Sequence, residues 1–168
     1  LLELRMNDNA SEDNTGSVSV EVSRCRVQNI RIEDLIIEDL STALDEHYVE
    51  VSAISAEGTK GLTIEGVDIY NLSHSATGPN ASTHGIRVGA SDDVSLKGVV
   101  ITNVMGAGLG ASVHTSGITT YGVRNLTLTE ITIDQITGAP GHYAAGIQLF
   151  GFDEPIGAYR VSGLSVSN

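Results

Sequence analysis

The chain has 168 residues, of which 18% are charged and 4% aromatic, and its formal net charge is −12. So acidic a chain, with lysine only at Lys60 and Lys97, lacks the cations that neutralise phosphates, which argues against nucleic-acid binding, and no apolar run approaches the roughly 20 residues of a membrane-spanning helix. Its 19 glycines and 3 prolines, with abundant Ser, Thr, Val and Ile, predict an all-β protein with many small turns.

The first 17 residues differ from the rest of the chain. Residues 1–7, LLELRMN, alternate like a short strand, and residues 8–17 read as a polar loop. We expect them to form an irregular edge of one domain that spans residues 1–168. The single cysteine, Cys25, cannot form an internal disulfide and is predicted to be a small buried hydrophobic residue.

From residue 18 onward the chain repeats an apolar pattern that slips. In NLTLTEITIDQI, residues 125–136, apolar residues lie two apart, then three, then two, then three. Neither a plain strand nor a helix explains this spacing. Successive copies lie 32, 32, 32 and 33 residues apart, a period that is typical of a solenoid. The copies start at Ile30, Leu62, Val94, Leu126 and Tyr159.

Each skip of three predicts a corner, and each pair two apart predicts a short strand with both side chains inward. A further short strand precedes each copy, at Val22, Ile54, Ile86, Ile118 and Ile147. The sequence therefore predicts an all-β, single-stranded right-handed parallel β-helix of about five coils of about 32 residues. Each coil is expected to contain three short strands and one long loop.

One corner column of the predicted solenoid is polar. In parallel, in-register stacks, side-chain amides can hydrogen-bond to the equivalent group on the next rung, about 4.8 Å away. Asn is also favoured at turns because its side chain hydrogen-bonds to nearby backbone. Both interpretations give this column a structural role. The members of this predicted ladder are Asp39, Asn71, Asn103, Gln135 and Asn168.

The stretch HGIRVGASDDVSLKGVVITNV, residues 84–104, resembles the parallel β-helix repeat of the pectate-lyase-like superfamily. Its features are Gly-Ile-x-apolar, a short polar turn, apolar-x-apolar, and a closing Asn. The resemblance covers roughly residues 18–168. That superfamily includes polysaccharide lyases, glycoside hydrolases, epimerases, phage tailspikes, adhesins and passive solenoids, so the resemblance implies a fold and leaves the function open.

In enzymes of that superfamily, substrate lies along one sheet face flanked by loops. The long loops before the Gly-Ile strands carry most of the histidines. A lyase acting on uronates needs a cation for the carboxylate and a base for the proton, which Arg87 with His84 or His114 would supply, beside Tyr121 and Tyr143. Solvated loop surface is the alternative interpretation. The outward column of the same strands is Ser23, Ser55, Arg87, Thr119 and Gln148. The binding candidates are Ser55, Thr119 and Gln148 from this column, together with Tyr143.

The polygalacturonase-type hydrolases also resemble this chain at His84-Gly85, but their other motifs are missing. The neighbouring coils lack the family's Asp residues, and no Arg-x-Lys exists. Asp92 and Asp93 are adjacent in a turn, whereas acid–base cleavage needs carboxylates on opposite sides of a bond. We assign them to turn chemistry or, alternatively, to calcium ligation. No other cofactor is evident.

Three functional hypotheses follow. The first is a non-catalytic scaffold, extracellular or on the cell surface, that is adhesive or forms filaments. It would contact polysaccharide through its sheet face or stack end to end with itself. The second is a carbohydrate-active enzyme of lyase or hydrolase type, or a fragment of one. The third is a carbohydrate-binding module, which needs exposed aromatic platforms, although the chain has no Trp and 5 Tyr. We favour the scaffold over the enzyme.

Overall fold

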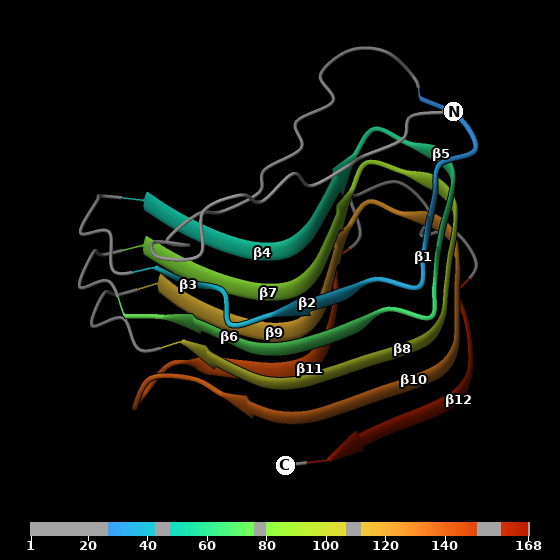
Figure 1. Ribbon diagram of the computed structural model, residues 1–168. Helices are drawn as coiled ribbons and strands as arrows, with labels where there is room; N and C mark the ends of the chain where they lie inside the picture. Colours follow the sequence, from blue (N-terminus) through green and yellow to red (C-terminus); the bar gives the residue numbers. More distant parts are fainter. Residues whose placement is uncertain (1–26, 43–47, 76–79, 107–111, 151–158, 168) are drawn as a thin grey trace, which may run out of the picture.

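The computed structural model describes residues 27–42, 48–75, 80–106, 112–150 and 159–167. These residues form strands and turns, with no helix among them, and they stack as a parallel β-solenoid of about three turns (Figure 1). The predicted fold class is confirmed. The coil number is lower than the predicted five, because the described residues cover the first and last turns only in part. The predicted strand at Val22 lies outside the described residues.

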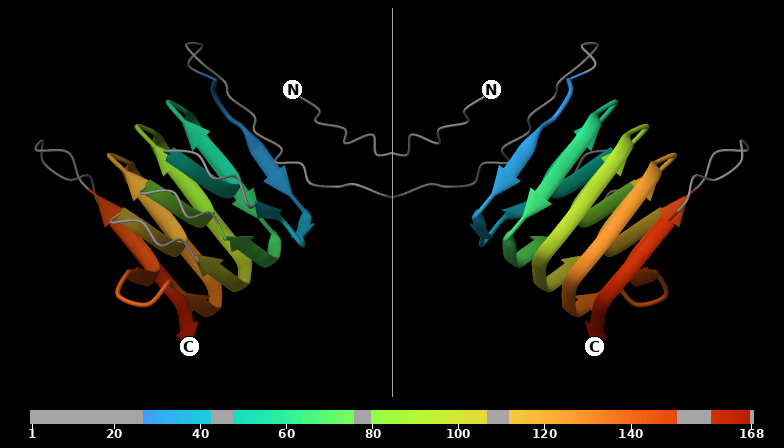
Figure 2. Two further views of the ribbon diagram at one scale, coloured as in Figure 1. Left: turned by 90° about the vertical axis from the view of Figure 1, so that its left-hand side faces the viewer. Right: turned by 90° about the vertical axis from the view of Figure 1, so that its right-hand side faces the viewer.

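Two parallel sheets make up the solenoid, and Figure 2 shows their strands stacked rung upon rung. Sheet B has the order β11-β9-β7-β4 and comprises β4 (Tyr48–Glu57), β7 (Asn80–Gly89), β9 (Ser112–Tyr121) and β11 (Tyr143–Phe150). Sheet A comprises β1 (Arg31–Glu33), β2 (Ile36–Glu38), β3 (Ser41–Thr42), β5 (Lys60–Glu65), β6 (Asp68–His74), β8 (Asp92–Gly106), β10 (Arg124–Thr137) and β12 (Tyr159–Ser167).

The predicted register is present. Ile64 lies opposite Ile32 on one side and Leu96 on the other, and the column continues through Leu128 to Val161. The prediction of three short strands per coil is wrong for three coils, because the second and third strands run together as the single strands β8, β10 and β12.

The slipped apolar pattern has a backbone cause. Residues at each skip of three have positive φ, which turns the chain by one residue so that the apolar residues on both sides face inward. Asp, Asn and Gly tolerate this conformation best, and they hold most of these positions. The first corner column is Asp34, Gly66, Gly98 and Glu130, and the second is Asp39, Asn71, Asn103 and Gln135.

The second corner column forms the predicted ladder over the residues whose contacts are described. Asn71 Nδ2 donates to Asp39 Oδ1, and Asn103 Nδ2 donates to Asn71 Oδ1, both at 2.8 Å. Gln135 continues the column by register, and Asn168 lies outside the described residues. A further rung that we did not predict joins Asn125 Nδ2 to Asp93 Oδ1 at 2.8 Å.

The space between the sheets is filled by aliphatic columns. Ile64, Leu96 and Leu128 are each 0% exposed, so each rung buries its apolar side chains against its neighbours, the energetics expected of a solenoid. The other columns behave alike, and their fully buried members include Ile69, Ile101 and Ile133 from sheet A and Ile86 and Ile118 from sheet B.

Some threonines also face this interior. The Thr83 and Thr115 hydroxyls are buried without a hydrogen-bond partner among the described residues. Burying a hydroxyl unpaired costs about 1–3 kcal/mol. We therefore expect Thr115→Val, which keeps the shape and removes the hydroxyl, to raise the free energy of unfolding by about 1 kcal/mol, as measured by urea denaturation.

Thr59→Val is the matched control for this substitution. Thr59 is also buried, but its hydroxyl donates to Ser91 Oγ at 2.9 Å, so its replacement should lower the free energy of unfolding. A Thr115→Val chain that loses as much stability as Thr59→Val would contradict the expected gain.

Candidate functional site

Sheet B bends at a column of small residues. A Cβ atom at Gly85 would lie 2.6 Å from the Gly117 carbonyl oxygen and 2.9 Å from Ile101 Cγ2. At Gly117 it would lie 2.7 Å from the Gly146 carbonyl oxygen and 2.8 Å from Ile133 Cγ2. Glycine is needed here because sheet B comes close to β8 and β10 of sheet A. Figure 1 shows β4, β7 and β9 curving at this point, with their concave side away from sheet A.

Four columns of side chains lie on the concave side, which we call the outer face of sheet B. Strand register brings one residue from each strand into each column. In the order β4, β7, β9, β11, the columns are Glu50, Ser82, His114 and Tyr143; Ser52, His84, Ser116 and Ala145; Ser55, Arg87, Thr119 and Gln148; and Glu57, Gly89, Tyr121 and Phe150.

A buried polar cluster occupies the middle of this face. His84 Nδ1 lies 2.8 Å from Ser116 Oγ and 3.2 Å from Thr119 Oγ1. The two hydroxyls also hydrogen-bond to each other, and Thr119 Oγ1 donates to Gln148 Oε1 at 3.5 Å. His84 is 1% exposed, and Ser116 and Thr119 are 0% exposed.

Burial also sets the protonation state of this histidine. Desolvation lowers the pKa of His84 to about 4, with a smaller contribution in the same direction from Arg87 and an opposing one from Glu50. The imidazole is therefore neutral at pH 7. A neutral ring accepts at one nitrogen and donates at the other, so it acts as a hydrogen-bonding group of the cluster.

Arg87 lies beside this cluster with its charge already paired. Its Nε is 3.2 Å from Glu50 Oε1, and its Nη1 is 3.8 Å from Glu57 Oε2. The guanidinium carbon lies 5.2 Å from the centre of the Tyr121 ring, a cation–π distance. Burial raises the pKa of the Tyr121 hydroxyl, with Arg87 opposing that change.

Aromatic rings stand at both margins of the outer face. Tyr121 and Phe150 stack with ring centres 5.0 Å apart and planes 6° apart, at one margin. At the other margin, His114 and Tyr143 lie 6.5 Å apart with a tilt of 47°. Tyr143 is 69% exposed and Phe150 is 43% exposed, so β11 offers aromatic surface to solvent at both margins.

The structure brings most of the predicted site residues onto this one face. His84, Arg87, His114, Tyr121 and Tyr143 all belong to its columns, as do Ser55, Thr119 and Gln148. Ser23 lies outside the described residues. The loop placement is wrong for His84 and His114, which lie within β7 and β9, and correct for His142, which lies in the turn before β11.

The sequence analysis missed four members of the site, namely Glu50, Glu57, Ser116 and Phe150. Glu50 holds Arg87, and Ser116 holds His84. Ser116 lies 32 residues after His84 in the strand register, so extending the repeat backward from the Gly-Ile motif would have found it. Thr119 is in the predicted column, but it is fully buried and so cannot meet a ligand directly.

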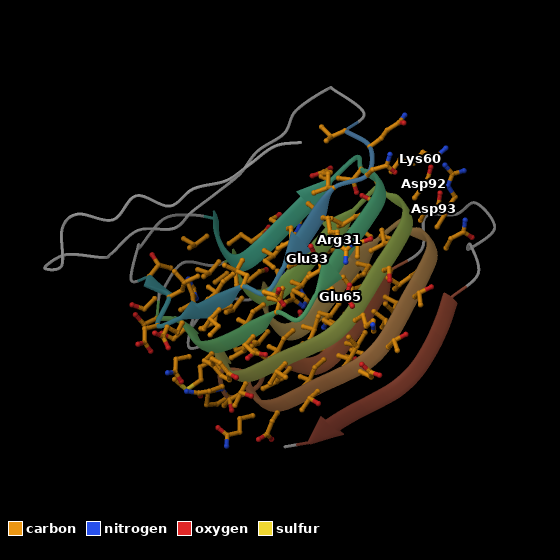
Figure 3. All side chains as sticks on the ribbon, turned by 45° about the vertical axis from the view of Figure 1, so that its right-hand side comes forward. Arg31, Glu33, Lys60, Glu65, Asp92 and Asp93 are labelled. Carbon is orange, nitrogen blue, oxygen red and sulfur yellow. The ribbon has the colours of Figure 1, made fainter. Side chains whose placement is uncertain are left out.

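Asp92 and Asp93 lie away from this face, at the corner where β8 begins (Figure 3). Arg124 donates to both oxygens of Asp92, at 2.6 and 2.7 Å, and Asp93 accepts from Asn125. These contacts support the turn interpretation. Within the described ranges, no group of three or more His, Cys, Asp or Glu side chains is arranged to hold a metal ion.

No family model, curated protein or solved structure was found to match this chain. Within the part of the chain that the structure describes, no helix is long and apolar enough to cross a membrane.

Proposed function

We propose that this chain is a non-catalytic solenoid scaffold, extracellular or on the cell surface, that binds polysaccharide through the outer face of sheet B. The observation that carries the proposal is the pair of aromatic margins with hydrogen-bonding side chains between them. Sugar rings stack their C–H faces on aromatic rings, while a few placed polar groups fix their hydroxyls.

The aromatic margins also strengthen the hypothesis that this face binds carbohydrate. Composition alone argues against aromatic platforms, since the chain has no Trp and 5 Tyr. The fold nevertheless gathers Tyr121, Tyr143 and Phe150 on one face. A scaffold needs no higher aromatic content when its register places the few rings together.

The same face supports catalysis poorly. His84 is 1% exposed and Ser116 is 0% exposed, so this pair cannot reach a substrate as base and nucleophile in the arrangement described. Arg87 is held by Glu50 and Glu57, which leaves it without a free charge for a substrate carboxylate. A base and a cation that act on a sugar must both contact it.

The proposal is tested by affinity electrophoresis in gels that contain single polysaccharides. At least one polymer is expected to retard the chain. Tyr143→Ala and Phe150→Ala should each weaken that retardation by about tenfold, which corresponds to about 1.4 kcal/mol. Met105→Ala is the matched control, because Met105 is 42% exposed but belongs to sheet A.

Two outcomes would contradict the proposal. Release of new reducing ends or of unsaturated sugars from a retained polymer would replace the scaffold with the enzyme hypothesis. Retardation that survives both aromatic substitutions, or that is lost equally in Met105→Ala, would show that the outer face of sheet B is not where the polymer binds.

A further inference from the structure

We infer that the ligand of the outer face of sheet B is a neutral glycan, with polyuronates disfavoured, and that it lies over β9 and β11. This inference rests on the proposed function and adds the class of sugar. Its basis is that charged side chains lie on the half of the face formed by β4 and β7, whereas the exposed aromatic rings lie on the half formed by β9 and β11.

Among the described residues in the columns of the outer face, Asp, Glu, Lys and Arg occur only in the half that β4 and β7 contribute. Glu50 and Glu57 come from β4 and Arg87 comes from β7. Two carboxylates and one guanidinium give this set a net charge of −1, and His84 adds none because its pKa is about 4. A polyuronate brings one carboxylate per sugar to a chain whose formal charge is already −12, so repulsion opposes its approach.

Arg87 cannot offset this repulsion without breaking existing contacts. It is bound to Glu50 and Glu57 and lies over Tyr121. Its side chain is only 24% exposed, so the ion pair with Glu50 is partly desolvated. Removing one partner of such a pair leaves a poorly solvated charge, which costs more than a surface pair would. A substrate carboxylate would have to displace Glu50 from the guanidinium of Arg87.

The half of the face formed by β9 and β11 carries the groups that a neutral sugar uses. On β11, the outward residues are Tyr143, Ala145, Gln148 and Phe150. The two rings are exposed, and the half-buried Gln148 lies between them. An amide both donates and accepts, which matches sugar hydroxyls, and Ala145 leaves room beside it. Seven residue steps separate the two rings, about 23 Å along the contour of the strand, and the bend of the sheet makes the direct distance shorter.

The test is isothermal titration with oligosaccharides of equal length. The neutral probes are glucan, galactan, mannan and xylan oligomers, and the acidic probe is oligogalacturonate. At low salt, at least one neutral probe is expected to bind at least about tenfold more tightly than oligogalacturonate. Raising the salt concentration should narrow this ratio, because screening weakens the repulsion. Tyr143→Ala should weaken the binding of the neutral probe by about tenfold.

A second variant tests the role of charge directly. The double substitution Glu50→Gln with Glu57→Gln removes two carboxylates and frees Arg87, so oligogalacturonate should gain about tenfold in affinity relative to the neutral probe. Circular dichroism checks that the variant is folded. Oligogalacturonate binding that equals or exceeds neutral binding in the unmodified chain would overturn this inference and leave the proposed function intact. Binding of neither class would overturn the proposed function itself.

Discussion

Gly117→Ala should lower the free energy of unfolding by more than about 3 kcal/mol, which exceeds the usual cost of overpacking a core. The added Cβ would lie 2.7 Å from the Gly146 carbonyl oxygen and 2.8 Å from Ile133 Cγ2. The first contact is with backbone that belongs to the neighbouring strand, so no side-chain rotation relieves it. The second is with a fully buried side chain. To accept alanine, the two sheets must separate at the bend.

Gly89→Ala is the matched control for this substitution. The Cβ at Gly89 would meet Glu57 Cγ at 3.5 Å, an ordinary van der Waals contact. This change should be neutral or should stabilise the chain by about 0.4–1 kcal/mol, because alanine restricts the unfolded chain. Urea denaturation of both variants gives the comparison. Equal stability of Gly117→Ala and Gly89→Ala would show that sheet B does not approach sheet A as described.

The glycine column also explains which parts of the molecule could be predicted from the sequence. The aliphatic columns and the corners recur every 32 residues, so their stacking follows from spacing. The bend of sheet B does not follow, because Gly-Ile in a repeat reads as the start of a strand. The glycine allows a close approach between Gly85 and Ile101. The period of a repeat carries no information about the distance between two sheets.

The strands of sheet B are longer than the repeat pattern predicts, and this changes the surroundings of the site residues. The pattern places His84 on a loop, yet β7 begins at Asn80. A loop histidine is expected to be solvated, whereas His84 within the bent strand is almost fully buried. For the same reason the sequence pattern did not indicate Glu50, which lies on β4 and forms an ion pair with Arg87. The sequence therefore predicts which residues belong to the site better than it predicts how far each is exposed to solvent. Exposure decides whether a histidine can act as a base or only as a structural hydrogen-bonding group.

The burial of His84 should make the fold sensitive to acid. Its pKa is about 4 in the folded chain, against about 6.5 when unfolded. Because the folded pKa is the lower one, the unfolded chain takes up the proton first. The contribution of His84 to the free energy of unfolding is therefore fully present above about pH 6.5 and is lost as the pH falls towards 4. A difference of about 2.5 units corresponds to about 3 kcal/mol. Burial lowers the pKa of His74 as well, which acts in the same direction.

His84→Gln isolates this contribution. The glutamine amide can hydrogen-bond to Ser116 but does not titrate in this range. The free energy of unfolding, measured in urea at intervals from pH 8 to pH 4, should fall less steeply in the variant than in the unmodified chain. Carboxylates and His74 titrate in both proteins, so they cancel in the difference between the two curves. That difference should open between pH 6.5 and 4. Parallel curves would mean that the His84 imidazole is accessible to protons in the folded chain, and the buried polar cluster would then not exist as described.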